Sequence, residues 1–176
     1  MDILQTIMSA TGSGAMAEIA RKVGLSEADA AAVLGKIAPA LGRGVAGNAA
    51  SANGLSGLLD ALKSGNHQRY LDDPALAGSQ EGIADGNKIL GHILGSKDVS
   101  RALAGRAAQQ TGVDPALIKQ MLPMVATLAM GALSKQRSAA GGDGALQGML
   151  GSLLDADGDG SIADDLLGMA GKLFGR

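Results

Sequence analysis

The strongest constraint on the fold is an apolar pattern with helical spacing that occurs twice in the chain. In residues 30–45 it places apolar side chains on one face of a helix, at Ala30, Val33, Leu34, Ile37, Ala38, Leu41 and Val45. A shift of 88 residues moves this face, without a gap, onto Ile118, Met121, Leu122, Val125, Ala126, Ala129 and Leu133. Two long helices therefore have to bury one face each within the same chain.

The residues ahead of each pattern carry the signals that end one helix and begin the next. Gly24 is expected to end a helix, and Ser26 is followed three positions later by an acid, the spacing of a capping box. Gly112 is expected to end a helix in the same way, Asp114 is the predicted N-cap, and Pro115 suits the first helical position. The preceding segments also correspond, "MAEIARKVG" against "AGRAAQQTG". We therefore predict two related helical hairpins.

The correspondence continues, with a slip of four residues, between "LLDALKSGNHQRYLDD" at 58–73 and "LGSLLDADGDGSIADD" at 150–165. We predict an internal duplication. The first helical unit covers 1–80, and the second, with the Asp-rich loop and the last helix, covers 81–176; the two are expected to pack as one globular body. Because no β-type alternation rich in Val, Thr or aromatic residues stands out, the fold class is all-α, a compact multi-helix protein.

Helices are expected over most of the chain, at 3–11, 15–23, 27–47, 55–63, 82–94, 97–111, 115–135, 145–154 and 162–174. The polar stretch 64–82 is interpreted as a long connection, and "SKQRSAAGGDG" at 134–144 as a flexible linker. With one Phe, one Tyr and no Trp, the core has to consist of small and aliphatic side chains. Such a core requires closely packed backbones. Most of the 28 Gly are expected at helix ends.

Charge and cysteine content exclude several classes of protein. The chain has 15 Lys and Arg against 17 Asp and Glu, which gives no global attraction to nucleic acid or to anionic lipid. The absence of Cys excludes disulfides, thiolate metal sites and Cys nucleophiles. No basic region precedes the short apolar run at the N-terminus, so we expect no secretory signal and a cytoplasmic location. The apolar run 121–133 is shorter than the roughly 20 residues of a bilayer span, which favours a buried helix.

The segment "LLDADGDGSIADDLLG" at 153–168 has the most recognisable chemistry. Calcium loops carry carboxylates at positions 1, 3 and 5, Gly at position 6 and a backbone carbonyl ligand at position 7, and this segment meets all of these requirements. Leu166 stands where a bidentate Glu is expected at position 12, so water or a neighbouring Asp has to complete the shell. The candidate metal ligands, with calcium as the cation, are Asp155, Asp157, Asp159, Ser161 and Asp165.

The same residues also suit a solvated turn ahead of a last helix. Ser161 can cap that helix, with Asp164 at its third position, and acidic side chains favour the positive end of the helix dipole. This alternative does not account for the alternate spacing of Asp155 and Asp157, whose mutual repulsion is unfavourable without a cation. Weak calcium binding and a metal-free cap therefore both stay open.

Other motifs give little support to catalysis or to nucleic-acid binding. Residues 18–37 have the spacing of a DNA-binding helix-turn-helix, but the second helix begins "EADAAA" and offers bases and phosphates no suitable side chain. His67 and His92 have no companion at ligand spacing. The chain has no Gly-x-Ser-x-Gly elbow and no Walker loop. We predict no catalytic residue, no cofactor except possible calcium, and no nucleic-acid partner.

Four segments together resemble the YidB-like bacterial proteins, a family defined as a domain of unknown function. They are "GLS…VLGKIAPAL", "GVD…MLPMVATLAMGAL", "NKILGHILG" and the C-terminal "LLDADGDGSIADDLLGMAGKLFG". The resemblance covers nearly the whole chain, and its last block is the most specific part. It implies a small, all-helical, soluble bacterial protein, and it implies no activity and no site residues.

These features favour a non-enzymatic protein-binding or self-assembly module. The apolar face of 162–174 suits packing within the chain or docking to another subunit or protein. A membrane surface is disfavoured because the basic residues there are Lys172 and Arg176 alone. We expect an unknown protein partner or self-association. The alternatives are a calcium-responsive helical protein that uses the loop 155–165 and an enzyme of unrecognised type.

Overall fold

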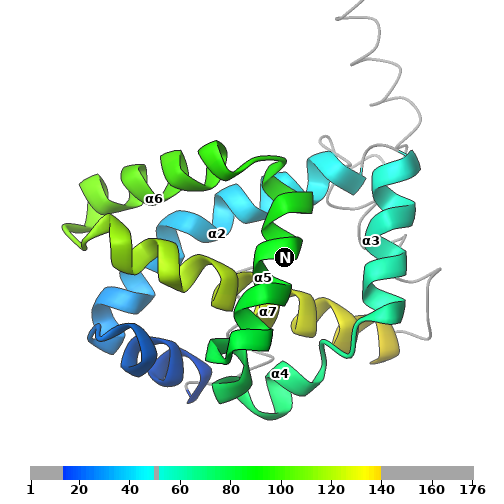
Figure 1. Ribbon diagram of the computed structural model, residues 1–176, viewed down its shortest axis with the longest axis horizontal. Coiled ribbons are helices and arrows are strands. Elements are labelled where there is room, and N and C mark those ends of the chain that lie inside the picture. Colours follow the sequence, from blue (N-terminus) through cyan, green and yellow to red (C-terminus); the bar gives the residue numbers. More distant parts are fainter. Residues whose placement is uncertain (1–13, 50–51, 140–176) are drawn as a thin grey trace, which may run out of the picture. The chain divides into compact units, whose positions relative to one another are not determined.

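The computed structural model describes residues 14–49 and 52–139 (Figure 1). These residues form helices joined by short turns, and none of them forms a strand, which confirms the all-α fold class. The helices cover 14–23, α2 (Glu27–Ala49), α3 (Ala52–Ser64), α4 (Arg69–Asp72), η1 (Pro74–Gly78), α5 (Gln80–Leu94), α6 (Lys97–Thr111) and α7 (Pro115–Ala139). The chain divides into two compact units, Met1–Lys135 and Gln136–Arg176, and the contacts below belong to the first.

The turn between the first described helix and α2 has the predicted capping residues. Gly24 has φ +76°, and the next backbone N–H, that of Leu25, donates to the Ala20 carbonyl at 2.9 Å. The Ser26 hydroxyl oxygen accepts from the backbone N–H of Asp29 at 3.1 Å. Each bond satisfies a polar backbone group that a helix end leaves unpaired, so the local sequence is sufficient to place this turn.

The turn between α6 and α7 is built in the same way. Gly112 has φ +75°, and its N–H donates to the Ala108 carbonyl at 2.8 Å. The Asp114 carboxylate accepts from the N–H of Ala116 at 2.6 Å, and α7 begins at Pro115. Both hairpins are therefore confirmed as local structures, while the duplication and the units 1–80 and 81–176 stay predictions.

The apolar faces predicted for the two long helices are directed into the core. All the α2 positions of the pattern are buried, and in α7 the pattern is buried except at Ala129 and Leu133, which are half-buried. In α7 the opposite side is covered as well, because every residue from Met121 to Leu128 is buried. This helix crosses behind α5 in Figure 1 and forms the centre of the first unit.

One stretch of α7, Pro115–Lys135, is long and apolar enough to cross a bilayer, judged by length and composition alone. The most apolar window of this stretch is 72% buried among the other helices. A core helix of a folded domain has the same composition. The predicted burial of the apolar run 121–133 is confirmed.

Glycine brings the helices close together. A Cβ at Gly86 of α5 would collide with the carbonyl of Pro123 in α7, and one at Gly44 of α2 would lie 2.7 Å from the Ile93 carbonyl oxygen. The expected close backbone packing is thus confirmed. The expectation that most Gly end helices is wrong for the described part of the chain, where Gly24, Gly65, Gly78, Gly95 and Gly112 do so and more lie within helices. A core without bulky side chains leaves gaps that closer helix approach has to remove.

The stretch 64–82, interpreted from sequence as a polar connection, is more ordered than that. It contains α4 and the 3-10 helix η1, and it buries His67 and Tyr70. The stretch assigned to a flexible linker, 134–144, begins inside α7, which continues to Ala139. The segment is ordered because the apolar ring of Tyr70 is buried, which its polar composition did not indicate.

Candidate functional site

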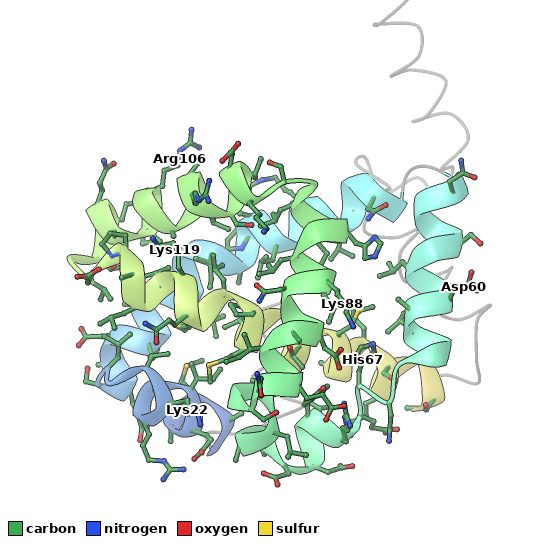
Figure 2. All side chains as sticks on the ribbon, viewed as in Figure 1. Lys22, Asp60, His67, Lys88, Arg106 and Lys119 are labelled. Carbon is green, nitrogen blue, oxygen red and sulfur yellow. The ribbon has the colours of Figure 1, made fainter. Side chains whose placement is uncertain are left out.

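The predicted metal ligands lie outside the described residues. These are Asp155, Asp157, Asp159, Ser161 and Asp165, so the calcium interpretation and its cap-and-turn alternative both stay predictions. Within 14–49 and 52–139, no group of three or more His, Asp or Glu side chains is placed to hold a metal ion. The remaining candidates for a site are the charged side chains of the described helices, which Figure 2 shows as sticks.

A polar cluster joins α4 to α5. The buried Tyr70 hydroxyl donates to the Asp85 carboxylate at 2.7 Å and accepts from the Arg69 guanidinium at 2.7 Å. The same guanidinium donates to Glu81 at 2.8 Å and lies over the Tyr70 ring, 4.7 Å from its centroid. Lys88 lies 3.6 Å from Asp85. These bonds attach the stretch that contains α4 to the side of α5.

Electrostatics keeps this cluster in one protonation state near neutral pH. Burial, helped by the hydrogen bond to Asp85, raises the pKa of Tyr70, which keeps the phenol protonated. Burial alone would raise the pKa of Asp85, but the Tyr70 hydrogen bond and the charge of Lys88 outweigh it and lower the pKa. The phenol and the acids thus each have a partner, which suits a structural role better than proton transfer.

The two histidines lie in different surroundings. His67 is buried, with its Nε2 3.2 Å from the Ala61 carbonyl oxygen, between the end of α3 and the start of α4 (Figure 2). Burial lowers the pKa of His67 and so favours the neutral ring. His92 is exposed on α5 and lines a small apolar hollow of about 190 Å³ beside α2 and α3. Neither environment resembles a metal site.

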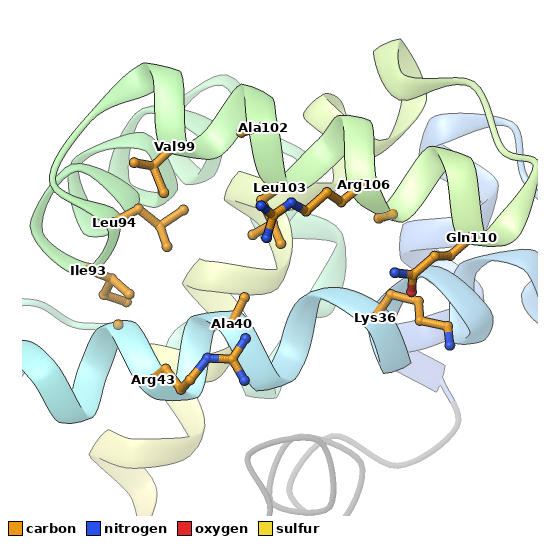
Figure 3. A pocket seen from close by; sticks show the side chains of 12 residues that line it. Lys36, Ala40, Arg43, Ile93, Leu94, Val99, Ala102, Leu103, Arg106 and Gln110 are labelled. Carbon is orange, nitrogen blue, oxygen red and sulfur yellow. The ribbon is translucent and has the colours of Figure 1, made fainter.

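A groove between α2 and α6, with the end of α5 at its base, has the features of a binding site (Figure 3). Its volume is about 630 Å³. It is lined by Lys36, Ala40, Arg43 and Gly44 of α2, Ile93 and Leu94 of α5, and Val99, Ala102, Leu103, Arg106, Ala107 and Gln110 of α6. We call this hollow the α2–α6 groove.

The walls of the α2–α6 groove are basic, and its lining contains no acid. Lys36 and Arg43 extend from α2, and Arg106 extends from α6 toward the same space (Figure 3). None of these three exposed side chains forms an ion pair with any described residue, whereas Arg21 pairs with Glu18 and Arg101 with Asp98. Among the described residues, no ion pair therefore has to break before the groove receives an anionic group.

The base of the groove is aliphatic. Ile93, Leu94 and Leu103 are half-buried there, and Val99 is 47% exposed, which is unusual for so large an apolar side chain in this body. Exposed apolar surface between charged walls favours a ligand that carries both kinds of group. A second hollow of about 420 Å³ also has basic walls, but one of its cations, Arg101, is already paired.

Local sequence places the side chains, and helix packing forms the groove. Lys36 and Arg43 lie two turns apart on one face of α2, about 10.5 Å along its axis. Gly95, at φ +76°, ends α5, and the Ser96 hydroxyl accepts from the Val99 N–H at 3.3 Å to begin α6, which packs against α2. This site was not predicted from the sequence. The seven-residue spacing of Lys36 and Arg43 was the one signal available, because Arg106 on the opposite wall is remote in the chain.

The geometry defines an all-helical protein with a basic groove, and sequence comparison places it in a family. A family model described as a bacterial protein of unknown function (DUF937) matches residues 5–136, more than half of the chain. The chain belongs to this family, which includes YidB, so the predicted resemblance is confirmed. The C-terminal block at 153–175, taken as its most specific part, lies beyond the matched residues. No curated protein and no solved structure matches the chain.

Proposed function

We propose that this protein is a non-enzymatic binding module whose α2–α6 groove contacts another protein or a second copy of the chain. The observation that carries the proposal is that the basic side chains on both sides of a partly exposed aliphatic base form no ion pair with any described residue. Contacts to charged and apolar groups contribute favourably to binding when a complementary surface replaces the water around them. The groove, as opposed to the Asp-rich loop, is then the primary site.

Several features support binding over catalysis. The acids and the phenol near Tyr70 are occupied by one another, and the groove lining offers cations and one amide but no general base. The groove also lacks an aromatic side chain on which a nucleic-acid base could stack, and the whole chain has a net charge of −2. We therefore propose a cytoplasmic protein with a protein partner, and neither a nucleic-acid nor a membrane ligand.

Site-specific photo-crosslinking in living cells tests this function. A benzophenone amino acid replaces Ala102, which is exposed in the groove, and in a control it replaces Ala31, which is exposed on α2 outside the groove. We expect irradiation to attach a defined protein, or a second copy of the chain, at position 102 and not at 31. Equal labelling at both positions, or none at 102, would contradict a binding role for the groove.

Calcium binding by the loop 155–165 is a second candidate function, favoured by the alternation of Asp155, Asp157 and Asp159 before Gly160. Without the bidentate acid, we expect a dissociation constant of about 0.1–1 mM. Calcium at about 5 mM should raise the melting temperature relative to chelator, by mass action. Asp157→Ala should abolish the rise; an unchanged melting temperature in the parent chain, with no calorimetric binding, would leave the cap-and-turn interpretation.

A further inference from the structure

We infer that the partner presents an acidic amphipathic helix to the α2–α6 groove, with carboxylates on Lys36, Arg43 and Arg106 and an apolar face on the aliphatic base. This inference rests on the proposed function and names the chemistry of its partner. It follows from three properties of the groove, namely the distribution of charge, the length of its walls and the nature of its base.

The charge distribution selects a carboxylate-bearing ligand that lies between the two helices. The cations stand on opposite walls, with Lys36 and Arg43 on α2 and Arg106 on α6, so a ligand inside the groove meets positive charge on both sides. A guanidinium binds a carboxylate through two parallel N–H···O bonds. Gln110 adds an amide on the α6 wall, beside Lys36 in Figure 3. Because the lining contains no acid, an acidic ligand does not compete with a lining carboxylate for these cations.

The length of the walls suits a short helical segment. From Val99 to Gln110, α6 lines the groove over about 16 Å, and the α2 wall from Lys36 to Gly44 extends over about 12 Å. Two to three turns of helix have this length, about 8–11 residues. Apolar side chains at positions i, i+3, i+4 and i+7 of such a segment form one stripe, which is the usual way a helix occupies an apolar groove.

The base of the groove favours a peptide over other anions. Ile93, Leu94, Val99 and Leu103 offer aliphatic contacts that phosphates and sugars do not use. A helix that bears Leu on one face and Glu on the flanks satisfies the base and the walls together, so the amphipathic helix is the ligand the groove fits best.

Fluorescence anisotropy with designed peptides tests the inference on the full chain. The probe is a labelled helical peptide with a Leu stripe flanked by Glu. One control has Lys in place of Glu, and another has Ser in place of Leu. We expect the acidic amphipathic peptide to bind at least about tenfold more tightly than either control, and its affinity to fall as salt is raised from about 0.05 to 0.3 M.

Variants assign the binding to the groove. Arg43→Glu with Arg106→Glu should weaken binding at least about tenfold, because both walls become repulsive. Val99→Ser should weaken it about threefold through loss of apolar contact. The matched control is Lys119→Glu, which reverses an exposed cation in the other basic hollow and should leave affinity unchanged. Circular dichroism melts establish that each variant is folded, and Arg43→Gln with Arg106→Gln replaces the first pair if it is not.

Each alternative outcome overturns the inference in a recognisable way. Equal binding of the Glu and Lys peptides, or equal loss with Lys119→Glu, would show that the groove does not read acidic charge. A single-stranded DNA oligonucleotide, or vesicles of phosphatidylglycerol and phosphatidylcholine, that bind in place of the peptide would assign another ligand. If crosslinking at Ala102 still captures a protein while the acidic peptide fails to bind, the proposed function stands and this inference alone is wrong.

Discussion

Helices α2 and α7 begin with the same arrangement of Gly, cap and apolar stripe, yet they occupy different places in the fold. In α2 one side is buried, and the other exposes Ala31, Gly35, Lys36, Pro39 and Arg43. In α7 both sides are buried from Met121 to Leu128. The predicted stripe thus accounts for the burial of one face of each helix. The surrounding helices determine whether the other face is exposed or buried.

Positions that correspond under the 88-residue shift show the difference directly. Lys36 in α2 corresponds to Met124 in α7, and Ala40 corresponds to Leu128. The α2 side chains line the basic groove, whereas Met124 and Leu128 are 1% and 0% exposed. The side next to the shared stripe therefore lines the groove in α2 and lies in the core in α7.

The largest expected effect on stability comes from exchanging the residue types at the corresponding positions 36 and 124. Met124→Lys buries an ammonium group without a partner and should lower the free energy of unfolding by about 3–5 kcal/mol. Lys36→Met should change it by no more than about 0.5 kcal/mol, because this side chain is exposed. Urea denaturation followed by circular dichroism measures both. A loss below about 1 kcal/mol for Met124→Lys would place that side of α7 at the surface.

Substitutions in the apolar stripe that α2 and α7 share should have similar effects on stability in both helices. Leu34→Ala in α2 and Leu122→Ala in α7 remove side chains that are each 1% exposed, and both should cost about 2–5 kcal/mol. The same urea titrations, run side by side, give the two values. If either substitution cost less than about 0.5 kcal/mol, the stripe would not be the core face of that helix.

A smaller effect concerns the approach of α5 to the centre of α7. Gly86→Ala should destabilise the protein by about 1–3 kcal/mol, because the new Cβ meets the Pro123 backbone, which cannot move as a flexible side chain would. The control is Gly91→Ala on the same helix, where nothing lies within 4 Å; there the higher helix propensity of Ala should stabilise by up to about 1 kcal/mol. Thermal melts that rank the two variants the other way would refute close packing at Gly86.

The smallest expected effect is a pH dependence of stability that comes from His67. This residue lies in the segment that packs on α7, and its carbonyl oxygen would be 2.8 Å from a Cβ at Gly131. Burial lowers the pKa of His67 below its ordinary value of 6.5, so the unfolded chain binds a proton more readily than the folded one. Stability should therefore be full above about pH 6.5 and decline as the pH falls below it.

Urea midpoints at about pH 7.5 and 5.5 measure this decline. His67→Gln should reduce it, whereas His92→Gln, which removes an exposed ring from α5, should leave it unchanged. A decline that is identical in the parent chain and in His67→Gln would assign the pH dependence to other groups.

The helix starts were predicted correctly from the sequence where the interaction that fixes them joins residues close together in the chain. The caps at Ser26 and Asp114 were predictable because each side chain bonds to a backbone group within three residues. Burial of Tyr70 was not predictable from its polar neighbours in the chain, because its hydroxyl bonds to Asp85, which lies in α5 beyond η1. The α2–α6 groove was missed for the same reason.

By itself the sequence determined that this chain is all-α, where the two long helices begin, and which face of each is buried, because capping and apolar spacing act within a few residues. It also placed the chain in its family. The tertiary structure decided that α7 is covered on both sides, that glycine allows α5 to approach Pro123, and that Lys36 and Arg43 share a groove with Arg106. Those features depend on which helices lie side by side, and packing between segments far apart in the chain is a property of the whole fold.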